Sequence, residues 1–160
     1  MIMININNFI QEKLKINSKS QVNQYKYQPQ NRAEFLNLLK KLIKERGNNA
    51  DLNDIDVSKI DDMNCLFYLH FSDEFNGDIS GWDVSNVTDM HYMFKKSKFN
   101  GNISNWNVSN VTNMTGMFEK SKFNGDISTW NVNVKPEWMN NIFKGCKLEK
   151  NPPKWYHEKS

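Results

Sequence analysis

Residues 75–98 read FNGDISGWDVSNVTDMHYMFKKSK, and residues 99–122 read FNGNISNWNVSNVTNMTGMFEKSK. A third copy, FNGDISTWNVNVKPEWMNNIFKGCK, occupies residues 123–147 and carries one extra residue. A sequence that repeats every 24 residues is typical of a protein in which each repeat forms one coil, stacked on the coil before it. The repeat therefore predicts a solenoid, an architecture that usually binds other proteins.

The repeat extends beyond these three copies in both directions. Upstream, the apolar spacing of the later coils is matched by Val57, Ile60, Met63 and Phe67. Downstream, Leu148 and Trp155 take the places of Phe99 and Trp106. Pro152 and Pro153 are expected to close this last, truncated coil. We therefore expect a repeat region over residues 49–156, with about four coils and a truncated last one, Leu148–Tyr156.

Each coil combines a polar, turn-forming half with a half that has helical spacing. The apolar positions of one coil are Phe75, Ile79, Trp82, Val84, Val87, Met90, Met93 and Phe94. Stacking should place equivalent apolar residues on one another and so build a continuous core. The sequence predicts a short strand near residues 78–80 and a two-turn helix over residues 88–96, in which Met90, Met93 and Phe94 share a face. The expected fold class is an α/β solenoid with right-handed, leucine-rich-repeat-like coils.

The segment before the repeats holds the strongest helix signal. Asn31 followed by Glu34 is typical of a helix N-terminus, and Gly47 follows the last apolar position. The apolar stripe is formed by Phe35, Leu38, Leu39, Leu42 and Ile43. Because terminal coils need covering, residues 31–48 are predicted to cap the solenoid. Residues 1–30 are expected to be a leader, flexible or with a short helix, and residues 157–160 a tail.

The first residues and the cysteines indicate a compartment. The stretch MIMININNFIQEKLKINSKSQ lacks the basic start and the small-residue cleavage site of a secretory signal. No stretch approaches the roughly 20 apolar residues that span a bilayer. Cys65 and Cys146 fall in different coils, too far apart for a disulfide, and are expected to be reduced. We expect a cytoplasmic protein, with a cell-surface or secreted protein as the alternative if a signal has been removed.

The net charge of +3 is modest, but lysines recur at one place in each coil. The repeated positions carry Lys95, Lys96, Lys98, Lys120, Lys122, Lys144 and Lys147. Stacked on one edge, they could bind an acidic protein surface or, less in keeping with the modest charge, a nucleic acid. The alternative is a solvated edge that keeps the protein soluble.

Positions that differ between coils are candidate contact residues, because repeated positions build the scaffold. His91 and Tyr92 become Thr115 and Gly116 in the next coil. We therefore include His91 and Tyr92 among the candidate partner-binding residues.

Enzymatic and metal-binding functions have little support. Asp78, Asp83 and Asp89 are replaced by asparagine in the next coil, although a calcium-binding repeat needs carboxylates in every copy. The three histidines stand in no nucleophile or metal motif. We expect no catalytic residues, no cofactor, no metal and no small-molecule substrate.

The phrase FNGDISxWDVSNVTDMxxMF resembles the BspA-type leucine-rich-repeat surface proteins of bacteria, whose family includes mycoplasma proteins. The resemblance covers residues 49–155 and recurs in three clear copies. It implies a leucine-rich-repeat-like fold and protein interaction, often adhesion at the cell surface, and it supplies no catalytic residues.

The main hypothesis is a small intracellular binder or inhibitor of a specific bacterial protein. Such a binder could be phage- or mobile-element-encoded, as an anti-defence (anti-CRISPR) protein or an immunity protein. Adhesion of the BspA type is the first alternative, and RNA binding through the recurring lysines is a weaker one.

Overall fold

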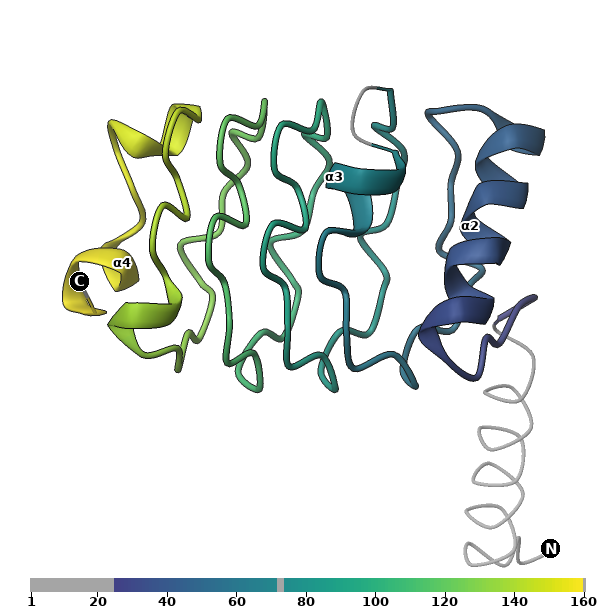
Figure 1. Cartoon of the computed structure of the whole chain (residues 1–160), viewed down its shortest axis with the longest axis horizontal. Coiled ribbons are helices and arrows are strands. Elements are labelled where there is room, and N and C mark those ends of the chain that lie inside the picture. The colour runs from purple at the N-terminus through teal and green to yellow at the C-terminus, as the bar shows by residue number, and fades with distance from the viewer. Residues whose placement is uncertain (1–24, 72–73, 160) are drawn as a thin grey trace, which may run out of the picture.

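The computed structural model describes residues 25–71 and 74–159, so most of the predicted leader, residues 1–30, lies outside it. Successive coils stack side by side between a helix at one end and a short helix at the other (Figure 1). We call residues 49–71 the first coil, 75–98 the second, 99–122 the third and 123–147 the fourth. The helices are α2 (Arg32–Arg46), α3 (Leu66–His70), the 3₁₀ helices η2 (Pro136–Trp138) and η3 (Lys147–Glu149), and α4 (Lys154–Lys159).

Phenylalanine rings form two columns through the interior. The rings of Phe75 and Phe99 are nearly parallel, with centroids 6.3 Å apart, and Phe123 continues the column at 6.4 Å. In the second column Phe118 stacks on Phe94 with ring centroids at 5.6 Å and on Phe143 at 6.0 Å. All six side chains are at most 3 % exposed. The predicted stacking of equivalent aromatic residues is therefore confirmed.

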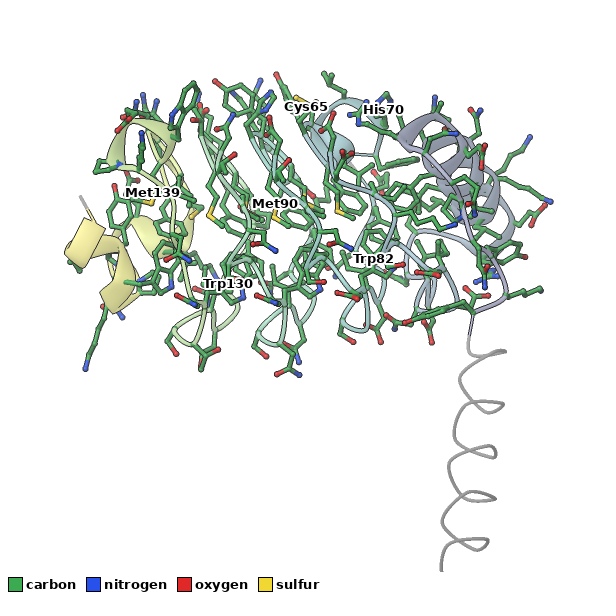
Figure 2. All side chains as sticks on the ribbon, turned by 90° about the horizontal axis from the view of Figure 1, so that it is seen from below. Cys65, His70, Trp82, Met90, Trp130 and Met139 are labelled. Atoms are coloured by element: carbon green, nitrogen blue, oxygen red, sulfur yellow. The ribbon has the colours of Figure 1, made fainter. Side chains whose placement is uncertain are left out.

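Tryptophans form a third column and add hydrogen bonds between coils. The ring centroids of Trp82 and Trp106 are 6.4 Å apart, as are those of Trp130 and Trp155. Each indole N–H donates to a carbonyl of the preceding coil, at 3.0 Å for Trp82 to Leu52 and 2.8 Å for Trp155 to Ile127. Trp155 thus occupies the repeat position predicted for it. Figure 2 shows Trp82 and Trp130 along the length of this interior.

The predicted α/β fold class is wrong, because the described residues contain no strands. Their pairing is limited to isolated parallel bridges, such as Asp51 with Asp78 and Asp89 with Asn113. Near the predicted strand at residues 78–80, Asp78 Oδ1 accepts the N–H of Ser80 at 2.9 Å. Asn102 and Asp126 accept the N–H of a serine in the same way in the next two coils. This side-chain bond turns the backbone after one paired residue, so no ladder extends into a sheet.

The predicted helix over residues 88–96 is also wrong: Asp89 forms isolated bridges, and residues 91–96 form consecutive turns. Alternate N–H groups donate to the next coil: Met90 to Asn113 O, Tyr92 to Thr115 O and Phe94 to Met117 O, each at 2.9 Å. The remaining N–H groups close short turns, as Met93 does onto Met90 O at 3.1 Å. Because every second amide points along the stack, a continuous α-helical hydrogen-bond pattern is impossible.

Helix α2 begins and ends where the sequence predicts. The N–H of Glu34 donates to Asn31 Oδ1 at 3.0 Å, and the N–H of Gly47 donates to Ile43 O at 2.9 Å. Its buried face consists of Phe35, Leu39 and Leu42, all 0 % exposed. The Phe35 ring packs edge-on against Trp82 with centroids 5.3 Å apart. Helix α2 therefore covers the aromatic interior. It lies at one end of the stack (Figure 1).

Both cysteines are buried free thiols. Cys65 precedes α3, and Cys146 lies between the fourth coil's Phe143 and η3. Burial raises the pKa of both thiols, which disfavours the reactive thiolate. The structure gives these residues a packing role.

Candidate binding edge

Six exposed lysines line one edge of the stack, and we call this set the lysine edge. Its members are Lys96, Lys98, Lys120, Lys122, Lys144 and Lys147. They follow Phe94, Phe118 and Phe143, whose column fixes the spacing of the coils. Backbone bonds hold the same register, with the N–H of Lys96 on Glu119 O at 2.8 Å and that of Lys120 on Lys144 O at 2.7 Å. The stack thus presents the lysines at regular intervals.

Two of these lysines occupy an unfavourable backbone conformation. Lys96 and Lys120 have φ values of 56° and 57°, in the left-handed region. The fourth coil places Gly145 at the equivalent position, with φ 74°. A left-handed conformation costs a side-chain-bearing residue roughly 1–2 kcal/mol, and glycine avoids that cost. The second and third coils therefore carry lysine where glycine would fit with less strain.

Lys95 is not part of the exposed edge. Its Nζ lies 2.8 Å from Glu119 Oε2, and the two side chains are only 16 % and 13 % exposed. The same ammonium sits 4.1 Å from the centroid of the Tyr92 ring. The hydrogen bond between the two groups raises the pKa of Lys95 and lowers the pKa of Glu119. Lys95 therefore joins the second coil to the third.

Tyr92 and His91 also make contacts within the protein. A Cβ atom at Gly116 would lie 2.3 Å from Tyr92 Cε1, so the Tyr92 ring packs directly over this glycine. His91 Nδ1 lies 2.8 Å from Asp89 Oδ1. Both side chains are half-buried. The change from Tyr92 to Gly116 thus reflects packing between unlike neighbours, which the sequence pattern did not reveal.

Little negative charge opposes the lysine edge. Residues 95–98, 119–122 and 144–150 contain eight lysines and two glutamates. Glu119 is paired with Lys95, and Glu149 Oε2 accepts the N–H of Gly145 at 2.9 Å. Glu74 reaches Lys98 at 3.3 Å, but both side chains are more than half exposed, so this pair is weak. The edge keeps a positive charge that suits an anionic surface.

A shallow pocket of about 560 Å³ lies at the fourth-coil end of this edge. It is lined by Lys122 and Lys147 together with Lys150, Gly145, Cys146, Ser121 and Glu149. The lysine edge is therefore hollowed here, between two of its members, Lys122 and Lys147, and the neighbouring Lys150.

Sequence reasoning missed a second exposed feature, Trp138 in η2. Its side chain is 50 % exposed, whereas the four other tryptophans are 3–6 % exposed. It lines a pocket of about 490 Å³ with Asp89, Thr112, Asn113, Asn133 and Lys135. The available signal was the extra residue near Lys135, which accompanies a break in the repeat.

Two further features are absent from residues 25–71 and 74–159, the part of the chain that the structure describes. No group of three or more His, Cys, Asp or Glu side chains there could hold a metal ion. No helix among the same residues has the length and apolar character needed to cross a membrane.

Comparison with known proteins places the chain in a family. A family model described as "Mycoplasma protein of unknown function, DUF285" matches residues 36–155. The match covers the larger part of the chain, so the chain belongs to this family. No curated protein and no solved structure gives a match.

Proposed function

We propose that this member of the DUF285 family is a non-enzymatic binding module that recognises an acidic surface on another protein. The lysine edge carries the proposal. Its six exposed ammonium groups stand at intervals fixed by the phenylalanine column, and two of them are held at an energetic cost. Surface charge of one sign speeds the encounter with an oppositely charged partner and selects its orientation.

The packing of the coils supports binding without chemistry. Lys95, Glu119 and Tyr92 are engaged with one another, which holds the backbone of the edge in place. The exposed lysines therefore extend from a rigid support, and a rigid surface loses less entropy on binding than a mobile one.

Two settings are consistent with such a module, and each has one supporting observation. An intracellular binder or inhibitor of a specific protein is favoured by the buried free thiols of Cys65 and Cys146, which suit a reducing compartment. A surface adhesion module of the BspA type is favoured by the family match, because DUF285 proteins are related to that group. RNA binding through the lysine edge is the third candidate. It predicts that the binding affinity falls steeply as the salt concentration rises.

The test is affinity capture with the tagged full chain from lysate and from a surface extract of the source cells. A lysine-edge variant carries Lys96→Glu, Lys120→Glu and Lys122→Glu. The matched control carries Lys40→Glu, Lys41→Glu and Lys44→Glu on the exposed face of α2, with the same change in net charge. Captured material is identified by mass spectrometry and by nuclease treatment.

We expect one stoichiometric protein to be captured by the wild type and the α2 control and lost with the lysine-edge variant. The fraction that contains the partner decides between the two settings. Equal capture by all three proteins would remove the lysine edge from the site. Capture of nuclease-sensitive material alone would replace the proposal with RNA binding.

A further inference from the structure

The fourth coil breaks a rule that the first three obey. In each of the first three coils, an acid or amide stands before the buried methionine, and its oxygen accepts the N–H two residues later. Asp62 does so at 2.8 Å, Asp89 at 2.8 Å and Asn113 at 3.1 Å. Trp138 occupies this position in the fourth coil, and its indole has no oxygen to offer. The tryptophan therefore does not perform the structural task of this position.

The backbone is rebuilt around the same residue. Two residues, Thr112 and Asn113, separate the buried valine from the buried methionine in the third coil. Four residues, 135–138, fill that place in the fourth coil, and the last three of them form the 3₁₀ helix η2. The longer segment leaves the indole half exposed. Departures from an otherwise consistent pattern are expected at functional positions.

The pocket beside Trp138 combines one aromatic surface with several polar groups. It measures about 490 Å³, within the range of small-molecule sites. Asp89 Oδ1 is engaged by the N–H of His91, and Asp89 Oδ2 is only 3.5 Å from Asn113 Nδ2, a weak contact. Asn133 uses its Nδ2 on Ser109 O at 3.3 Å, and its carbonyl oxygen is a further acceptor. Lys135 adds a donor.

We propose that this pocket binds a neutral saccharide. A sugar ring has a face of C–H groups that can lie against an indole, and hydroxyls at its rim that both donate and accept hydrogen bonds. Asp89 and the two asparagines line the pocket together with the apolar indole, and they supply acceptors and donors. A polyanion is disfavoured by the Asp89 carboxylate, and a purely apolar ligand would leave the polar lining groups unpaired. This site does not depend on the lysine edge or on its partner.

The distribution of tryptophans allows a selective test on the full chain. Since four of the five are buried, acrylamide quenching of fluorescence reports mainly on Trp138. Quenching is measured with and without glucose, galactose, mannose, N-acetylglucosamine and their neutral disaccharides. In parallel, the labelled chain is applied to a printed array of neutral and acidic glycans. Trp138→Ala is the test variant. Leu69→Ala is the matched control, because Leu69 is the other large apolar residue that is exposed among the described residues.

We expect at least one neutral saccharide to protect Trp138 from quenching and one neutral glycan class to bind on the array. Trp138→Ala should weaken that binding about tenfold or more, which corresponds to about 1.4 kcal/mol. Leu69→Ala and the lysine-edge variant should bind as the wild type does. Three results would overturn the proposal: no neutral glycan bound, binding unchanged in Trp138→Ala, or binding confined to acidic glycans.

Discussion

The third and fourth coils share one interior and differ in what they expose. Phe118 and Phe143 stack in one column, and the indoles of Trp106 and Trp130 both donate to the preceding coil. In contrast, Asn113 completes a turn while Trp138 is half exposed beside a pocket. Stacking thus fixes the buried positions of every coil and leaves the outer positions free to change. Both proposed binding sites, the lysine edge and the pocket beside Trp138, lie at these outer positions.

The largest expected loss of stability comes from removing the helix that caps the first coil. Deleting residues 29–47 removes α2, whose Phe35, Leu39 and Leu42 are fully buried. The exposed interior should cause aggregation and loss of cooperative unfolding, because a terminal coil cannot bury its own apolar face. Sedimentation and urea unfolding check this. A monomeric deletion variant with a cooperative transition would show that the coils need no cap.

Gly116→Ala tests the packing between unlike neighbours in the second and third coils. The new methyl group would lie 2.3 Å from Tyr92 Cε1, at a residue with φ 58°. We expect a loss of about 2–4 kcal/mol in the free energy of unfolding, from backbone strain and overpacking. Gly47→Ala is the control, since it has positive φ but open space around it. The Tyr92→Ala background should recover part of the loss; no recovery would mean that the ring is not the obstacle.

The pair of Lys95 and Glu119 should give a smaller, pH-dependent effect. The pKa of Glu119 is lowered, so its contribution is complete at neutral pH and is lost as the pH falls through the folded-state pKa. The pKa of Lys95 is raised, so its contribution is lost as the pH rises through its folded-state pKa, in the alkaline range. Glu119→Gln should cost about 1 kcal/mol near neutral pH and much less in acid. A cost that stays constant with pH would contradict the ion pair.

The smallest effect on stability is expected from changes to the exposed lysines. Changing Lys96, Lys120 and Lys122 to glutamate should alter the free energy of unfolding by about 0.5 kcal/mol or less per site. Equilibrium urea unfolding at moderate salt checks this, with the α2 charge variant beside it. A large loss would mean that the lysine edge stabilises the stack instead of serving a partner.

The sequence predicted the stacking and the capping helix because both depend on apolar spacing. Met90, Phe94 and Trp106 recur in phase, and Asn31 marks the start of α2. The same spacing misled the prediction of a helix over residues 88–96. An apolar spacing of three and four residues also fits consecutive turns. The turns differ from a helix because alternate backbone N–H groups donate to carbonyls of the next coil. Those partners are 23 residues away, as with Met90 and Asn113, and no local pattern shows them.

At the candidate site, too, the sequence predicted some features and could not predict others. Periodicity placed the lysines of the edge, but it could not separate Lys96, which is exposed, from Lys95, which is paired across coils. Tyr92 looked like a free variable position until Gly116 proved to be its packing partner. Variation along a repeat can thus mark a contact between coils as well as a binding residue.

The most direct test compares one substitution in the two coils, Trp106→Ala and Trp138→Ala, by equilibrium urea unfolding. Trp106 is 4 % exposed and donates to Ile79 O at 3.3 Å, whereas Trp138 is 50 % exposed. We expect Trp106→Ala to cost about 3–5 kcal/mol and Trp138→Ala about 1 kcal/mol or less. Similar losses for the two variants would contradict the division between a fixed interior and a free exterior.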